Sequence, residues 1–200
     1  MEGFDMCYIV KISKLYLLLL LFSVDLSAQV ATTVSGYPVI DLSALSPLGA
    51  VLSSADASTR RTQMNQQSPS NSAYLGVGSS VSGENGTWNA KMSIKFQVMR
   101  SDLGSATDWS SGWNACKLYN GEGGGVGSWR LPTQRELIMI WGLHPLLIEK
   151  GGFSAFTVSI YWSASECNAS YAWYVNFSSG FVSYYSKTTG TYRVRCVRDL

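Results

Sequence analysis

The tryptophan residues constrain the fold of this 200-residue chain more than any other feature, because all seven lie after residue 87. Aromatic side chains contribute much of the burial that stabilises a core. Residues 29–87 contain no Trp and are rich in Ser, Ala and Gly. We therefore expect a compact domain at residues 88–200. The preceding residues 29–87 are expected to be a stalk, a small β unit or a segment that orders against a partner.

Residues 1–28 have the order of a secretory signal peptide. Lys11 and Lys14 precede an apolar run at residues 15–24, and small residues follow up to Ala28. This run is shorter than the roughly 20 residues that span a bilayer. We expect cleavage after Ala28, secretion or display at the cell surface, and no membrane span in the mature chain. An uncleaved membrane anchor is the alternative.

Charge and cysteine content narrow the possible partners. Cleavage would remove two of the 15 basic and three of the 13 acidic residues, which leaves a net charge of +3. This balance is too small to indicate a nucleic-acid partner. Export permits disulfides, and the three remaining cysteines allow one bridge with one cysteine left over. These cysteines are Cys116, Cys167 and Cys196.

The first of two predicted helices covers residues 108–121. Asp108 has the side chain of an N-cap. One face of this helix carries three residues at helical spacing, namely Trp109, Trp113 and Cys116. Gly121 has the backbone freedom that commonly ends a helix.

The second predicted helix covers residues 133–142. Thr133 and Glu136 have the spacing of a capping box, in which each side chain satisfies a backbone N–H of the first turn. Gly142 is expected to end this helix. Arg130 and Glu136 are expected to pair as buried framework charges rather than to act in catalysis.

A two-residue period predicts strands in the rest of the domain. One strand is expected at residues 88–100, and three more at residues 172–177, 181–186 and 192–199. Alternate side chains of the second strand should face the interior, namely Trp173, Val175 and Phe177. A strand, two helices and then an antiparallel sheet indicate an α+β fold.

Four motifs of the compact domain occur together. In chain order they are WRLPTQREL (129–137), YWSASE (161–166), AWYVNF (172–177) and RVRCVRD (193–199). They resemble the Lcl C-terminal domain family over about residues 88–200. The resemblance implies the C-type-lectin-like fold of formylglycine-generating enzymes, with two helices, a twisted antiparallel sheet and irregular loops. It also implies an extracellular domain with ligand-binding loops on a rigid frame, since family members include surface adhesins that bind sulfated glycans.

The resemblance also bears on the cysteines. Formylglycine-generating enzymes need a reactive cysteine pair that holds copper. Here Cys116 and Cys196 occupy the inner faces of the first helix and the last strand, which suits a structural disulfide. Two small buried hydrophobic residues are the alternative. We expect no enzyme activity and no cofactor.

Other kinds of site chemistry find little support. The EPN triplet of calcium-dependent lectins is absent, and the last 50 residues contain only two carboxylates, Glu166 and Asp199, so no metal is expected. His144 is the only histidine and has no nearby partners for a triad, so a partly buried structural role is expected. The glycine-rich residues 121–127 lack the Lys-Ser/Thr pair of a phosphate-binding loop.

Residues 168–186 contain no Asp, Glu, Lys or Arg, although protein surfaces normally carry roughly a quarter to a third charged residues. Burial explains the inward half of this segment but not the Tyr, Asn and Ser residues that alternate with it. Tyr offers a large contact area with few rotatable bonds, and Ser and Asn offer adaptable hydrogen bonds, as in antibody paratopes. We expect ligand binding by Cys167, Asn168, Ser170, Tyr171, Tyr174, Asn176, Ser178, Phe181, Ser183, Tyr184, Tyr185 and Tyr192.

These positions resemble the variable sites of proteins diversified by retroelements, which use the same lectin-like fold and vary in the same C-terminal region. Diversification mutates adenines, usually in AAC codons, so a variable position becomes a residue that an NNC codon encodes. Every predicted ligand-binding residue belongs to this set. Glu166, Trp173 and Lys187 do not, and the pattern assigns them to the framework. The odd cysteine, Cys167, would be one product of diversification.

We therefore expect an exported bacterial protein that binds an unknown protein or glycan at a cell or phage surface, and that is the variable protein of a diversity-generating retroelement. The alternative is a glycan-binding adhesin or fimbrial tip of fixed specificity. In that case Arg193, Arg195 and Arg198 would help to hold sulfate, although their alternate positions on one strand equally suit framework pairing. The sequence indicates no oligomeric state.

Overall fold

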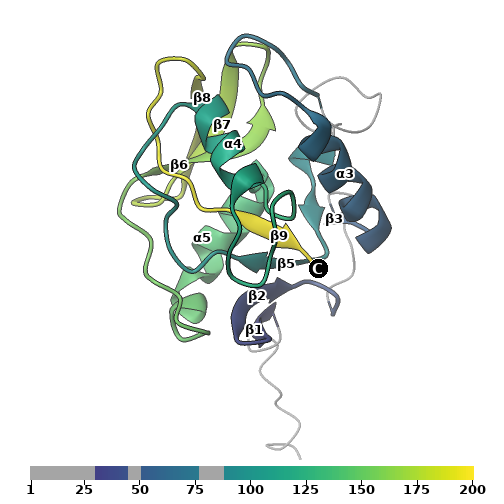
Figure 1. Cartoon of the computed structure of the whole chain (residues 1–200). Coiled ribbons are helices and arrows are strands. Elements are labelled where there is room, and N and C mark those ends of the chain that lie inside the picture. The colour runs from purple at the N-terminus through teal and green to yellow at the C-terminus, as the bar shows by residue number, and fades with distance from the viewer. Residues whose placement is uncertain (1–29, 45–50, 77–87) are drawn as a thin grey trace, which may run out of the picture.

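The computed structural model describes residues 30–44, 51–76 and 88–200 (Figure 1). The predicted signal peptide, residues 1–28, lies outside the described residues. Within the described ranges, three α-helices and antiparallel sheets confirm the α+β class. The elements are β1 (Ala31–Val34), β2 (Tyr37–Asp41), β3 (Val51–Leu52), α3 (Ser54–Gln66), the 3-10 helix η1 (Trp88–Ala90), β4 (Met92–Ser93), β5 (Lys95–Val98), α4 (Trp109–Leu118), α5 (Gln134–Ile148), β6 (Ile160–Glu166), β7 (Tyr171–Asn176), β8 (Phe181–Ser186) and β9 (Val197–Asp199).

The strands form a four-stranded sheet, a three-stranded sheet and a short parallel pair, β3–β4. The four-stranded sheet has the order β1-β2-β5-β9, and its neighbouring strands are antiparallel. The three-stranded sheet has the order β6-β7-β8 and is also antiparallel. In the view of Figure 1, the β1–β2 hairpin and the β7–β8 hairpin lie at opposite ends of the molecule.

The last strand is shorter than the predicted residues 192–199. β9 pairs with β5, where Phe96 lies opposite Asp199. Arg193, by contrast, forms a parallel bridge with Tyr161 of the other sheet. The C-terminal segment therefore passes from one sheet to the other, and only its last part can complete a regular ladder.

Two hydrophobic clusters make up the core. The first lies between the four-stranded sheet, α5 and β6–β7, and includes Phe96, Leu137 and Val175. The second lies between α4, β6 and the segment before β9, and includes Trp109 and Trp162. The β6–β7–β8 sheet contributes to both clusters, so its position is fixed from two sides.

The compact fold is larger than the predicted residues 88–200. Ile40 of β2 lies opposite Phe96 of β5 in the main sheet, and both side chains are fully buried. Arg60 of α3 is also fully buried. The N-terminal part contributes aliphatic side chains and one buried arginine to the core, so the distribution of Trp did not mark the boundary of the fold.

The helices confirm the predicted starts but not the predicted ends. At α4, the Asp108 side chain accepts a hydrogen bond from the Ser111 N–H at 3.1 Å. This helix ends at Leu118, because Tyr119 is already extended. At α5, both hydrogen bonds of the Thr133–Glu136 capping box are present.

Helix α5 continues past Gly142, where it was expected to end, and includes Pro145. Proline lacks the N–H that would bond to the carbonyl four residues earlier, which here belongs to Trp141. The Nδ1 atom of His144 lies 2.6 Å from that carbonyl oxygen and donates to it in its place. The predicted structural histidine therefore supports the last turns of the helix, which bury Leu147.

Candidate ligand-binding surface

A buried group of four charged residues, the charged cluster, joins two helices to the last strand. It consists of Arg60, Arg130, Glu136 and Asp199, and all four are buried. Arg130 bonds Glu136 at 2.7 Å and Asp199 at 2.5 Å, while Arg60 reaches the same two carboxylates at 3.2 and 3.3 Å. The predicted Arg130–Glu136 pair is confirmed. Two positive and two negative charges balance, so the cluster acts as a structural tie.

The ionised state of the charged cluster follows from its geometry. Burial alone would raise the pKa of Glu136 and Asp199. The positive charges of Arg130 and Arg60 and their hydrogen bonds outweigh burial, so the pKa of each carboxyl group lies below its usual range. Both carboxylates stay charged at neutral pH, and their oxygens are occupied by the guanidinium groups.

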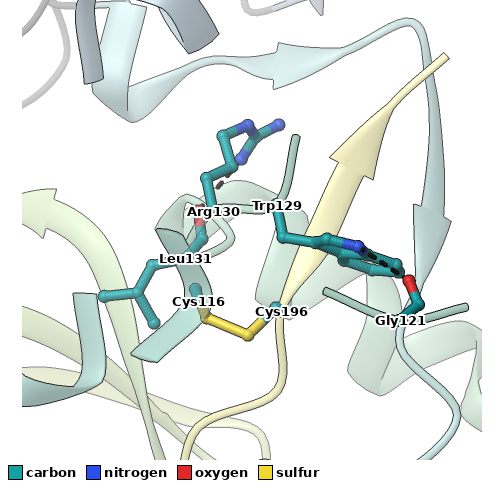
Figure 2. Close-up of a disulfide and its surroundings, with 6 residues drawn as sticks. All are labelled: Cys116, Gly121, Trp129, Arg130, Leu131 and Cys196. Atoms are coloured by element: carbon teal, nitrogen blue, oxygen red, sulfur yellow. Dashed lines mark hydrogen bonds between the residues drawn. A yellow bond between two sulfur atoms is a disulfide. The ribbon is translucent and has the colours of Figure 1, made fainter. Parts of the chain in front are cut away.

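A disulfide joins α4 to the segment before β9, as Figure 2 shows. It links Cys116 to Cys196 across 5.6 Å between Cα atoms, and both residues are fully buried beside Leu131. This confirms the predicted pairing. Nearby, the Trp129 indole N–H donates to the Gly121 carbonyl at 3.2 Å, which ties the glycine-rich loop to the same frame.

A second buried ion pair lies beneath the uncharged segment. Lys187, just after β8, donates to Glu166 at the end of β6 at 2.6 Å, and both side chains are buried. The same amino group donates to the carbonyls of Ala73 and Ala169 at 3.0 Å. Glu166 also accepts from the Leu75 N–H at 3.1 Å. Desolvation lowers the pKa of Lys187, and the Glu166 carboxylate opposes this effect.

One face of the β7–β8 hairpin, the tyrosine face, carries most of the predicted ligand-binding residues of the two strands. Because opposed residues share a face, the register assigns to it Tyr174, Asn176, Phe181, Ser183 and Tyr185, and Tyr192 packs against it. The Tyr192 ring lies 4.5 Å from the buried Trp162 ring, 5.2 Å from Tyr174 and 5.9 Å from Tyr185. Burial and the neighbouring phenols raise the pKa of Tyr192 to about 12, so the face is uncharged.

The opposite face of the hairpin holds a second aromatic group. Tyr184 makes edge-on contacts with Trp173 at 5.3 Å and with Tyr171 at 5.9 Å. Val175 continues this face into the first core cluster. Trp173 is half-buried, so of the predicted inward residues only Val175 and Phe177 are buried.

Two asparagines that were predicted to bind ligand also shape the turns. The Asn168 side-chain oxygen accepts from the backbone N–H groups of Ser170 and Tyr171, at 2.9 and 3.0 Å. The Asn176 oxygen accepts from the Ser178 N–H at 2.9 Å and from its hydroxyl at 2.7 Å. These acceptors are engaged within the turns, and sequence reasoning missed this role.

Trp141 of α5 fixes the far end of the hairpin. Its indole N–H donates to the Phe177 carbonyl at 3.3 Å. Gly180 has φ +74°, and a Cβ atom there would lie 2.7 Å from the Trp141 ring. Only glycine suits this position, so the turn and the helix hold each other.

Comparison with known proteins agrees with this frame. The model of the Lcl C-terminal domain matches residues 82–198. The chain belongs to the Lcl C-terminal domain family. No curated protein matches the chain.

The Lcl C-terminal domain displays every predicted ligand-binding position, and none of these residues is buried. The exposed ones are Asn168, Ser170, Tyr171, Ser178, Phe181, Tyr184 and Tyr185, and the half-buried ones are Cys167, Tyr174, Asn176, Ser183 and Tyr192. They form two neighbouring areas, the hairpin and the loop at residues 167–170. Cys167 and Asn168 also line a pocket of about 320 Å³ with Tyr74 and Ala169.

Two of the three C-terminal arginines of this Lcl C-terminal domain are held by the frame. Arg195 is buried and bonds Asp102 at 2.6 Å. Arg198 bonds the Gln97 side chain at 2.6 Å. Arg193 lies 3.6 Å from Asp102 and keeps a third of its side chain exposed. Arg195 and Arg198 therefore pair within the framework, which was one of the two roles predicted for these arginines.

No helix within residues 30–44, 51–76 and 88–200 is long and apolar enough to cross a bilayer. No group of three or more His, Cys, Asp or Glu side chains within them could hold a metal ion.

Proposed function

We propose that this protein is an exported ligand-binding protein of bacteria and the variable protein of a diversity-generating retroelement. One observation carries the proposal: the predicted variable residues are all exposed or half-buried, whereas the charged framework residues beside them, Glu166 and Lys187, are buried. Glu166 and Lys187, which an NNC codon does not encode, form the buried ion pair. The predicted variable residues, all of types that an NNC codon can encode, are exposed or half-buried.

The chemistry of the surface indicates how it would hold a ligand. The tyrosine face and its neighbouring loop contain no charged side chain, since Glu166 and Lys187 lie beneath them. Recognition would rest on aromatic contact and on hydrogen bonds from phenol, hydroxyl and amide groups, as in paratopes. Because the hairpin is held by the core and by Trp141, little ordering accompanies binding, which favours affinity. The ligand is a protein or a glycan.

Deep amplicon sequencing of the gene from a population of source cells tests the proposal. We expect substitutions concentrated at the predicted positions, all in NNC codons, with Glu166, Trp173 and the RVRCVRD segment unchanged. The turn geometry adds a sharper expectation: Asn176 should vary mainly among Asn, Asp, Ser and Thr, because these side chains can accept the Ser178 N–H. A uniform gene, or TCA and TAT codons at the serines and tyrosines, would refute diversification.

The second candidate is a glycan-binding adhesin or fimbrial tip of fixed specificity. The exposed third of the Arg193 side chain is the feature that favours it, whereas Arg195 and Arg198 are engaged in the frame. A glycan array at low and high salt separates the two. A sulfate-binding adhesin should lose affinity steeply with salt, and an uncharged aromatic surface should not.

An enzyme related to the formylglycine-generating family is the remaining alternative. Such an enzyme needs two reactive thiols, and here the two candidate cysteines lie in one buried disulfide. This favours binding over catalysis. Copper-dependent oxidation of a cysteine-containing peptide by the purified protein would overturn our assignment.

A further inference from the structure

The β8 strand forms one edge of the β6-β7-β8 sheet. Its register with β7 is continuous over six residue pairs, from Phe181 opposite Asn176 to Ser186 opposite Tyr171. Within the described ranges β8 pairs with no other strand. One side of this ladder is therefore available to a further strand.

The direction of the backbone groups along β8 follows from one hydrogen bond. The Lys187 N–H donates to the Ser170 carbonyl at 2.9 Å. In an antiparallel pair such bonds involve every second residue, so Ser183 bonds toward β7 and its neighbours Val182 and Tyr184 direct their N–H and C=O groups away from it. The outer edge thus presents two donors and two acceptors in a row.

This edge lacks the features that normally prevent strand addition. Natural proteins protect edge strands with charged residues, proline, bulges or short length. The β8 sequence, FVSYYS, contains no charge and no proline, and its register with β7 shows no shift. Large side chains project on both faces, since Phe181 is 60% exposed, Tyr184 49% and Tyr185 47%.

We propose that two copies of this chain associate through β8, antiparallel, with the two-fold axis at Ser183. This register places Val182 opposite Tyr184 of the second copy, and Tyr184 opposite Val182 of the second copy. Each of these two pairs forms two backbone hydrogen bonds, four in all. On the tyrosine face, Phe181 lies opposite Tyr185 of the second copy. Aromatic pairs and aromatic pairs with β-branched residues are favourable across strands. Because β8 contains no charged residue, pairing two copies of this strand brings no like charges together.

The neighbouring register is less suitable. With the axis at Tyr184, the outward groups of Ser186 would have to take part in the ladder. The Ser186 carbonyl already accepts from the Gly190 N–H at 2.9 Å. Self-complementarity therefore selects the axis at Ser183.

The dimer has a consequence for ligand binding. It extends the three-stranded sheet to a continuous six-stranded sheet, and both tyrosine faces lie on the same side of it. One strand pair buries a small area, which predicts a weak, reversible dimer. A ligand with two copies of an epitope would then be held at both faces and bound more tightly than by one.

Cysteine cross-linking tests the register on the full chain, in a background with both Cys7→Ser and Cys167→Ser, which leaves only the disulfide cysteines. Residues on the axis lie about 4.5 Å apart between Cα atoms in a pair without mutual hydrogen bonds, so Ser183→Cys should form a disulfide-linked dimer under mild oxidation. Ser170→Cys, at an exposed position away from the edge, is the matched control and should stay monomeric. Equal cross-linking of both variants, or of neither, would refute the proposal.

Sedimentation equilibrium provides a second, independent measurement. We expect a concentration-dependent monomer–dimer equilibrium for the unmodified chain. Ser183→Lys and Ser183→Asp should each be monomeric, because like charges meet on the axis, and their mixture should dimerise again. If the unmodified chain stayed monomeric at every concentration, the proposed dimer would be refuted. If Ser183→Lys dimerised as strongly as the unmodified chain, the interface would lie elsewhere and the proposal would also be refuted. Neither measurement uses a ligand, so the dimer and the proposed binding function can fail separately.

Discussion

The charged cluster and the tyrosine face belong to one domain but are built from opposite kinds of side chain. In the charged cluster every ionised group is buried, and each arginine contacts both carboxylates. On the tyrosine face no side chain is charged, and no ion pair holds one in place. The comparison shows that buried charges and a disulfide join the elements around the two hydrophobic clusters. The side chains of the tyrosine face, apart from the Asn176 oxygen that holds a turn, would then be available for the proposed recognition.

Removal of one buried charge should have the largest effect on stability. We expect Arg60→Ala to decrease the free energy of unfolding by about 3–5 kcal/mol, because it leaves Glu136 and Asp199 partly uncompensated in the interior. Chemical denaturation measures this value. The adjacent Arg61, which is not fully buried, is the matched control, and Arg61→Ala should change stability by less than about 0.5 kcal/mol. Similar losses in the two variants would contradict the structural role of the charged cluster.

The disulfide should come next. The Cys116→Ala and Cys196→Ala double variant should lose about 2–4 kcal/mol, since the bridge joins residues 80 positions apart and restricts the unfolded chain. The melting temperature and denaturation midpoint report the loss. Cys167→Ala provides the control, because this half-buried cysteine is outside the disulfide. If the double variant were as stable as the parent protein, the frame would not depend on the bridge.

A decrease in pH should lower the free energy of unfolding, by less than either substitution as far as pH 4. The folded pKa values of Glu136 and Asp199 are lowered, so their contribution is complete above the unfolded values near 4 and is lost as the pH falls toward the folded values. We expect a decrease of about 1 kcal/mol between pH 7 and pH 4, and a steeper one below. Denaturant titration at each pH measures it. A free energy of unfolding that stayed constant between pH 7 and pH 4 and below would contradict this role of the two carboxylates.

Changes on the tyrosine face should have the smallest effect. Tyr185→Ser should alter the free energy of unfolding by less than about 0.5 kcal/mol, because nearly half of its side chain is exposed. The same replacement in the interior, Tyr161→Ser, should remove about 3–5 kcal/mol, because that ring is fully buried. Parallel denaturation of the two variants sharpens the comparison. A large loss for Tyr185→Ser would mean that the face supports the fold.

Local sequence signals predicted much of this structure. The capping box at Thr133, the N-cap at Asp108 and the β7–β8 hairpin each depend on residues close together in the chain. The disulfide was expected because Cys116 and Cys196 occupy the inner faces of the first predicted helix and the last predicted strand. The Arg130–Glu136 pair was predicted within one motif, but its partners were not, because Arg60 and Asp199 are 139 positions apart.

Other features depend on contacts that no local pattern reveals. Continuation of α5 past Pro145 needs the His144 ring to replace a missing backbone donor. The inclusion of β1 and β2 in the core depends on pairing between β2 and β5, and that of α3 depends on the contacts of Arg60 with Glu136 and Asp199. The hydrogen bond that Asn176 makes within the turn depends on the path of the backbone there, which the residue type alone does not reveal.

The support of the β7–β8 hairpin at both ends has a consequence for any set of related sequences. The Lys187–Glu166 pair holds one end of the hairpin and Trp141 holds the other, so its backbone is fixed at both ends. Exchange of the side chains between these two points should alter what the protein touches without altering the path of its backbone. A library randomised at the tyrosine face should then behave as one folded population, and the structure of a single member would serve as a template for the others.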